Sequence, residues 1–153
     1  MSPFSAGQFP QEPRQQSAPG LLAELQAAHS TLLERIKELG EITAHAVPSR
    51  LEYTSARLRL SQASIERRSV LNRTLEYLGA RVDAAGSQVL ARVRAADGEL
   101  IAHSVEHLGK WTAEAVGSDW AGYCDASRSM RDHMARTVNA EAELLQPLLS
   151  PRD

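Results

Sequence analysis

The spacing of helix-breaking residues constrains the fold of this chain more than any other sequence feature. Turn-forming residues near positions 40–48, 79–86 and 117–118 divide residues 20–149 into four long segments. Within each segment apolar residues recur every three or four positions, which is the period of an amphipathic helix. Loops of a few residues join neighbouring antiparallel helices. We therefore predict an all-α protein, folded as an antiparallel up-down-up-down four-helix bundle.

The first two segments differ in the character of their apolar faces. The first runs from Leu21 to Gly40, or by one more turn to Thr43, and its stripe is rich in leucine. The second runs from about Ser49 to Gly79 without proline or an internal glycine. Its less apolar stripe indicates buried hydrogen bonds or a partly wet interior, with Gln62 and Asn72 as candidates. The residues assigned to this stripe are Leu51, Thr54, Leu58, Ser61, Ile65, Ser69, Asn72 and Leu75.

The third and fourth segments carry the remaining breaks. The third helix is expected from Gly86 to about Val116, with its apolar residues at Leu90, Val93, Leu100, Val105, Leu108 and Trp111. A bend is expected at Gly98, where Asp97 would cap the second half. The fourth helix is expected to start after the N-cap Ser118 and to end near Pro147 and Pro151.

Length and composition limit the class of protein. The 153 residues suit one domain, and we assign residues 20–149 to it. Residues 1–19, rich in Pro, Gln, Ser and Gly, are interpreted as a flexible tail that would suit binding of an unknown protein partner. A net charge of −2 gives no general attraction to nucleic acid or to an anionic membrane, and the arginines of residues 50–81 are interpreted as a solvated face.

The cysteine content, the lack of long apolar runs and the lack of catalytic motifs further limit the expected location and activity of the protein. The lone Cys124 and the lack of a long apolar run favour a cytoplasmic protein, either a monomer or a homodimer. Without a nearby basic partner, Cys124 is expected to pack rather than to catalyse. The sequence has no phosphate-binding loop and no nucleophile elbow, so no catalytic residue is assigned.

Four side chains on the expected inward faces form a candidate metal site. His103 and His107 are four residues apart, which places both imidazoles on one helical face. His29 lies within the apolar stripe of the first segment, and Glu141 within that of the fourth; His133 is one further candidate. Imidazole with carboxylate suits iron, zinc or manganese. The alternative is a hydrogen-bonded polar layer in the core.

Three of these features resemble the hemerythrin-like, or HHE cation-binding, four-helix bundles over residues 20–149. They are His29 ahead of LLERIKEL, the HxxxH pair His103 and His107, and the ending EAELLQPLL, which includes Glu141. The resemblance implies a bundle that holds a non-haem diiron centre through about five histidines and two carboxylates, and that binds or senses oxygen, nitric oxide or iron.

The chain departs from that family pattern on two helices. The family's second helix supplies a HxxxE pair, whereas matching on LEYL places Arg67 and Leu71 there; on the fourth helix the expected histidine is Thr137. We therefore expect a binding or regulatory module with a reduced or lost diiron site, keeping at most a single iron or zinc ion. The alternative is a functional non-haem metal protein that senses or binds oxygen, nitric oxide or iron. An oxidase would need an open coordination position and a complete set of ligand carboxylates, which the second helix does not supply.

A second resemblance is to the chemoreceptor zinc-binding bundles, which bind zinc through three histidines and a cysteine. It rests on the LGKW run after His107. The ligand cysteine of that family has no counterpart near this run, so this resemblance ranks second.

Overall fold

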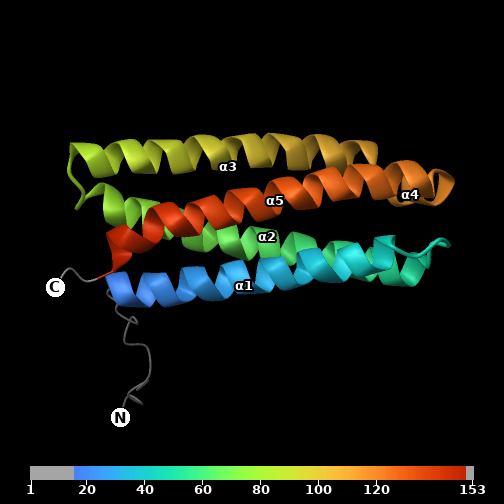
Figure 1. Cartoon of the computed structure of the whole chain (residues 1–153), viewed down its shortest axis with the longest axis horizontal. Helices are drawn as coiled ribbons and strands as arrows, with labels where there is room; N and C mark the ends of the chain where they lie inside the picture. Colours follow the sequence, from blue (N-terminus) through green and yellow to red (C-terminus); the bar gives the residue numbers. More distant parts are fainter. Residues whose placement is uncertain (1–15, 151–153) are drawn as a thin grey trace, which may run out of the picture.

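The computed structural model describes residues 16–150, and all regular structure within that range is helical. The elements are α1 (Ala18–Thr43), α2 (Arg50–Gly79), α3 (Ala84–Lys110), α4 (Ala113–Ser118) and α5 (Trp120–Leu149). The four long helices lie lengthwise beside one another, and α4 lies at the end farthest from the chain termini (Figure 1). The predicted all-α class is thus confirmed for the described residues. Most of the predicted tail, residues 1–15, lies outside them.

Short polar side chains define where the helices begin. The Ser17 hydroxyl accepts a hydrogen bond from the Gly20 amide, so α1 starts slightly before the predicted position. Asp83 and Asp119 accept amide hydrogen bonds in the same way at the starts of α3 and α5. The predicted N-cap Ser118 is therefore wrong by one residue, since Ser118 is the last residue of α4. These caps satisfy amides that have no partner within a helix, and replacing such a cap by alanine costs about 1 kcal/mol.

The predicted third helix is wrong in two respects. It continues through Gly98 as one helix and then ends at Lys110, well before Val116. Trp111 is buried against Tyr123, with ring centroids 5.8 Å apart, and Thr112 then caps the separate short helix α4. The buried indole thus fixes the chain reversal, and Val116 belongs to α4, where it is fully buried.

The buried face of α2 also differs from the prediction. Leu51, Leu58 and Ile65 are 79%, 59% and 65% exposed, and the polar candidates Gln62 and Asn72 are exposed as well. Leu75 is buried as predicted, but elsewhere the buried face combines large apolar residues with two alanines, one threonine and Arg67. The exposed leucines and isoleucine therefore indicated the wrong phase of the helix. The buried residues are Tyr53, Ala56, Leu60, Ala63, Arg67, Val70, Leu71, Thr74, Leu75 and Leu78.

The interior contains apolar clusters separated by a polar layer. One cluster, near the chain termini, includes Leu25, Leu71 and Leu145, and the next includes Leu32, Leu60 and Met134. On each long helix one buried polar residue lies, in the sequence, between the members of the two clusters. These residues are His29, Arg67, Asp97 and Glu141. A third cluster of aromatic residues closes the end at α4.

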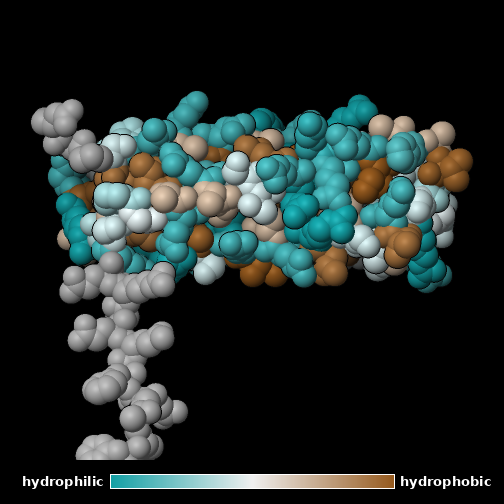
Figure 2. Space-filling view, turned by 90° about the horizontal axis from the view of Figure 1, so that it is seen from below, coloured by the Kyte–Doolittle hydropathy of each residue, from teal (hydrophilic) through white to brown (hydrophobic). Residues whose placement is uncertain are grey.

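The long helices do not pack evenly. The α1–α2 contact is the most extensive, α5 contacts α1, α3 and α4, and α2 contacts α3 much less. Val105 and Leu108, predicted as buried residues of the third helix, are 67% and 48% exposed beside this loose contact. On the side where α1 lies, hydrophilic residues surround separate hydrophobic patches (Figure 2). Among the described residues, the helices are too polar or too short to cross a membrane.

Candidate functional site

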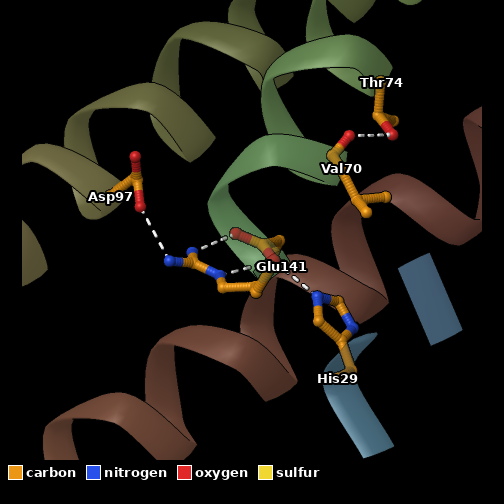
Figure 3. Close-up of polar contacts among 6 residues, drawn as sticks. His29, Val70, Thr74, Asp97 and Glu141 are labelled. Carbon is orange, nitrogen blue, oxygen red and sulfur yellow. Dashed lines mark hydrogen bonds and ion pairs between the residues drawn. The ribbon is translucent and has the colours of Figure 1, made fainter. Parts of the chain in front are cut away.

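The polar layer joins one side chain from each long helix. His29 of α1, Arg67 of α2, Asp97 of α3 and Glu141 of α5 are all buried, with exposed fractions of 6%, 0%, 8% and 3%. Figure 3 shows Asp97 on one side of the layer, and Glu141 and His29 on the other. The guanidinium of Arg67 lies between the two carboxylates and bonds to both. We call these four residues the polar layer.

The contacts of Glu141 use both carboxylate oxygens. Arg67 donates from Nη2 to Oε1 at 2.5 Å and from Nε to Oε2 at 3.3 Å, so the guanidinium and the carboxylate face each other in a bidentate pair. The His29 Nε2 lies 2.5 Å from Oε2 of Glu141. Since a carboxylate only accepts, Nε2 of His29 carries a proton in this contact. The remaining guanidinium group of Arg67, Nη1, donates to Asp97 Oδ1 at 2.8 Å.

The balance of charge explains how an arginine is tolerated in the core. Burial alone would lower the pKa of Arg67, but the hydrogen bonds and negative charges of Glu141 and Asp97 outweigh burial, and the pKa is raised above its ordinary value. Arg67 therefore keeps its charge at physiological pH. A buried cation is stable only when paired and hydrogen-bonded, and here two carboxylates meet that condition.

The structure brings together two of the four predicted metal-site residues. His29 and Glu141 are in direct contact within the polar layer. His103 and His107 lie six and ten residues beyond Asp97 on the same helix, which at about 1.5 Å per residue places them about 9 and 15 Å farther along its axis. His103 and His107 thus belong to other layers of the molecule.

His103 instead contacts His133, which the sequence suggested as an additional ligand. The two Nδ1 atoms are 2.7 Å apart and the rings are 5.0 Å apart between centroids. One ring must donate and the other accept, so at least one of the two is neutral. Burial, followed by the charges of His103 and Arg136, lowers the pKa of His133 in agreement with this arrangement.

His107 lies one turn farther along α3, beside Tyr123. The ring centroids of the two side chains are 6.0 Å apart. Burial, the charge of Arg57 and the charge of His103 lower the pKa of His107 to about 4, so the imidazole is neutral at physiological pH. Within residues 16–150, no three His, Cys, Asp or Glu side chains come together in a way that could hold a metal ion.

Arg67 and Asp97 are the functional-site residues that sequence reasoning assigned incorrectly. The arginines of residues 50–81 were interpreted as a solvated face, and Asp97 as a cap at a bend. A usable signal was present, because Arg67 lies four and seven residues from Leu71 and Leu60, both buried on the same helical face. A carboxylate in the apolar stripe of another helix, Glu141, supplied the reason to expect a buried cation.

Cys124 is half-buried and unpaired within the described part of the chain. Burial, together with the neighbouring charge of Asp125, raises the pKa of its thiol. A raised pKa leaves the thiol protonated and a poor nucleophile, in line with the packing role that the sequence indicates.

The chain matches no protein-family model, no curated protein and no solved structure. Its function is therefore argued from the geometry of the polar layer and of the surrounding helices.

Proposed function

We propose that this chain is a hemerythrin-like, antiparallel up-down-up-down four-helix bundle that serves as a non-catalytic, cytoplasmic binding or regulatory module. In this proposal the polar layer stands where related bundles hold a diiron centre. The observation that carries it is the position of Arg67, whose fixed positive charge lies between two buried carboxylates.

The proposal rests on how the potential ligands are already used. Glu141 accepts two bonds from Arg67 and one from His29, so its oxygens are occupied by donors within the protein. Asp97 is occupied by Arg67 in the same way. A metal ion at this position would have to displace a guanidinium that cannot lose its charge, and like charges would oppose its entry.

Metal analysis of protein purified without chelator, paired with a visible absorption spectrum, tests this proposal. We expect less than one iron per chain, no charge-transfer band, and a thermal midpoint that is unchanged by a chelator. Two irons per chain with such a band would overturn the proposal, since they would require a complete diiron site.

A second candidate is a single-metal site, favoured by the 2.7 Å approach of the His103 and His133 Nδ1 atoms from two helices. Imidazoles this close can turn to share a zinc or iron ion, with His107 one turn away. In that case His103→Ala, His107→Ala and His133→Ala would each lower zinc affinity at least tenfold in calorimetric titration. The matched control is His45→Ala, because His45 is exposed in the α1–α2 loop. Equal binding by all four variants would exclude this site.

A further inference from the structure

A cavity of about 210 Å³ lies between α2, α3 and α5, where α2 and α3 contact each other least. Its walls are mainly apolar and include Leu60, Ile65, Ile101, Met130 and Met134. A cavity of about 150 Å³ is large enough for benzene in another protein. This one therefore has room for one ring or a short acyl chain.

Polar side chains gather at the end of the cavity nearest α4. The guanidinium carbon of Arg57 lies 5.4 Å from the centre of the Tyr123 ring, and the His107 ring centre lies 6.0 Å from it. Arg131 belongs to the same group, since its Nε donates to Ser127 Oγ at 3.2 Å, one turn after Tyr123 on α5. This end thus places the Arg57 guanidinium beside the Tyr123 ring and the Arg131 guanidinium beside Ser127. Each already makes one hydrogen bond through Nη2, Arg57 to the Trp111 carbonyl and Arg131 to Thr43 Oγ1, and keeps other N–H groups for a ligand.

The charge lining the cavity is entirely positive. Three arginines, Arg57, Arg68 and Arg131, contribute to the lining, and no aspartate or glutamate does. Elsewhere Arg35, Arg59, Arg67 and Arg73 pair with carboxylates, but none of the three lining arginines has an ion pair within residues 16–150. The neutrality of His107 is a consequence of this local positive charge and of burial.

Buried donors that lack a hydrogen-bond partner within residues 16–150 also belong to residues that line this cavity. The buried side-chain polar atoms that lack a hydrogen-bond partner in residues 16–150 are Arg68 Nε and Tyr123 Oη, and both residues line the cavity. The Tyr123 side chain is completely buried. A buried donor without a partner destabilises a fold, so such atoms are rare unless a ligand or function requires them.

We infer that this cavity binds a small monocarboxylate with an apolar tail, such as a short-chain or medium-chain fatty acid. The carboxylate lies among Arg57, Arg131 and Tyr123 Oη, and the tail extends along Leu60, Ile101 and Met134. A guanidinium pair and a phenol donor match a carboxylate, whereas the absence of any acid in the lining disfavours an amine. The inference rests on the proposed function in that it names the ligand of the binding module.

Calorimetric titration of the full chain with octanoate tests this inference, with 1-octanol, octylamine and acetate as comparison ligands. Tryptophan fluorescence gives a second readout, because Trp111 and Trp120 each lie 5.8 Å from Tyr123 between ring centroids. We expect octanoate to bind at least tenfold more tightly than each comparison ligand, which lacks either the charge or the tail. Equal affinity for octanoate and 1-octanol, or no binding of octanoate, would overturn the inference.

Variants locate the carboxylate. Tyr123→Phe removes a hydroxyl whose oxygen has no hydrogen-bond partner of normal geometry within residues 16–150, so the fold should be retained while octanoate affinity falls about tenfold. Its matched control is Tyr77→Phe near the end of α2, because Tyr77 does not line the cavity. Arg57→Gln should weaken octanoate more than 1-octanol, whereas Arg92→Gln, an exposed change of the same charge, should alter neither.

Two further outcomes are decisive. Unchanged octanoate affinity in Tyr123→Phe and Arg57→Gln would place the ligand elsewhere and overturn the inference. Sedimentation that shows a dimer unaffected by octanoate, together with no octanoate binding, would overturn the inference and assign this face, with its exposed Ile65 and Val105, to a second copy of the chain. Metal content measured on the same preparation separates the two claims. Stoichiometric iron contradicts the proposed function alone, and failed octanoate binding contradicts this inference alone.

Discussion

Arg67 is the residue on which the interior of this molecule depends most. It is fully buried, bonds to carboxylates on two other helices, and is the largest side chain with almost no exposure. Removing one partner of a buried ion pair leaves an uncompensated charge and typically destabilises a protein by about 3–5 kcal/mol. Replacing all partners by apolar residues of similar size is often neutral.

We predict that Arg67→Ala lowers the free energy of unfolding by about 3–5 kcal/mol, because Glu141 and Asp97 lose their cation. Urea denaturation followed by circular dichroism measures the change. The control is Arg73→Ala, which removes an exposed pair with Glu24 and should change stability by less than about 1 kcal/mol. A similar loss in both variants would show that burial of the pair is unimportant.

The pairing itself predicts a rescue. In the double variant Arg67→Met, Glu141→Leu, an apolar contact replaces the buried pair, so part of the stability lost in Arg67→Met should return. Asp97 remains, but it lies nearer the surface, with 11% of its side chain exposed, and can find water there. His29 loses its hydrogen-bond acceptor when Glu141 is replaced, so the rescue is expected to be partial. A double variant that is less stable than Arg67→Met would contradict this account of the pair.

His107 predicts a dependence of stability on pH. Its pKa is about 4 in the folded protein and about 6.5 as an ordinary histidine, so the unfolded chain binds more protons between these values. The free energy of unfolding should therefore fall as the pH is lowered from about 6.5 to 4. His107→Gln should reduce this slope in urea titrations at several pH values, whereas the exposed His45→Gln should not. Identical slopes in all three proteins would contradict the prediction.

At the scale of single residues, the sequence predicted that Glu141 needs a partner, but not that Arg67 is this partner. A glutamate in an apolar stripe requires a cation, a metal or hydrogen bonds, and Glu141 indeed lies against a cation. The match on LEYL placed Arg67 at a position where the resemblance expects a ligand, but its burial was identifiable only once α2 was given its correct phase, since an arginine among arginines carries no periodic signal of its own. The contact of His103 with His133 depends on how two helices are rotated, which no local pattern specifies.

At the scale of elements, α3 shows how a glycine can be tolerated without bending a helix. Gly98 is inside α3, is exposed, and has open space where a Cβ would be. Gly86 is different, because an added Cβ would lie 2.5 Å from Val82 Cβ. Gly98 and Gly86 therefore allow the effect of an added methyl group to be compared at an open and at a crowded position of one helix.

We predict that Gly98→Ala stabilises the protein by about 0.5–1 kcal/mol, since alanine loses less backbone entropy than glycine in a helix. Gly86→Ala should destabilise it, because Val82 would have to move. Thermal melts of the two single variants measure both effects. A loss of stability in Gly98→Ala would show that the glycine is needed for a bend in solution.

Helix ends and helix faces were not equally predictable. Caps and prolines are local signals, so α1, α2 and α5 begin and end close to where the sequence indicates. The end of α3 was missed because Trp111 folds back onto Tyr123, which is a tertiary contact. The phase of α2 was missed because Leu58 and Ile65 face outward, while two alanines and Arg67 lie among the leucines of the buried face.

At the scale of the whole molecule, stability should be distributed unevenly. The contact between α2 and α3 is sparse, and the half of α3 after Leu100 has no fully buried residue, whereas the first half packs into the apolar cluster near the termini. Regions with few buried contacts open most readily.

We predict faster amide exchange in residues 101–110 than in residues 88–100 of the same helix, measured by hydrogen–deuterium exchange with mass spectrometry. Octanoate should slow exchange in 101–110 more than in 88–100, because the cavity borders the former. Uniform protection along α3 would show that the loose contact does not weaken this end.

The polar layer has one more consequence, which concerns how the helices are aligned lengthwise. Leucine clusters above and below the layer would accept a helix shifted by one turn, about 5.4 Å, with modest repacking. Such a shift would move His29, Arg67, Asp97 or Glu141 into an apolar cluster, where its charge would be unpaired or its hydrogen bond lost. The polar layer thereby permits only one lengthwise alignment of four amphipathic helices whose apolar faces would otherwise be interchangeable.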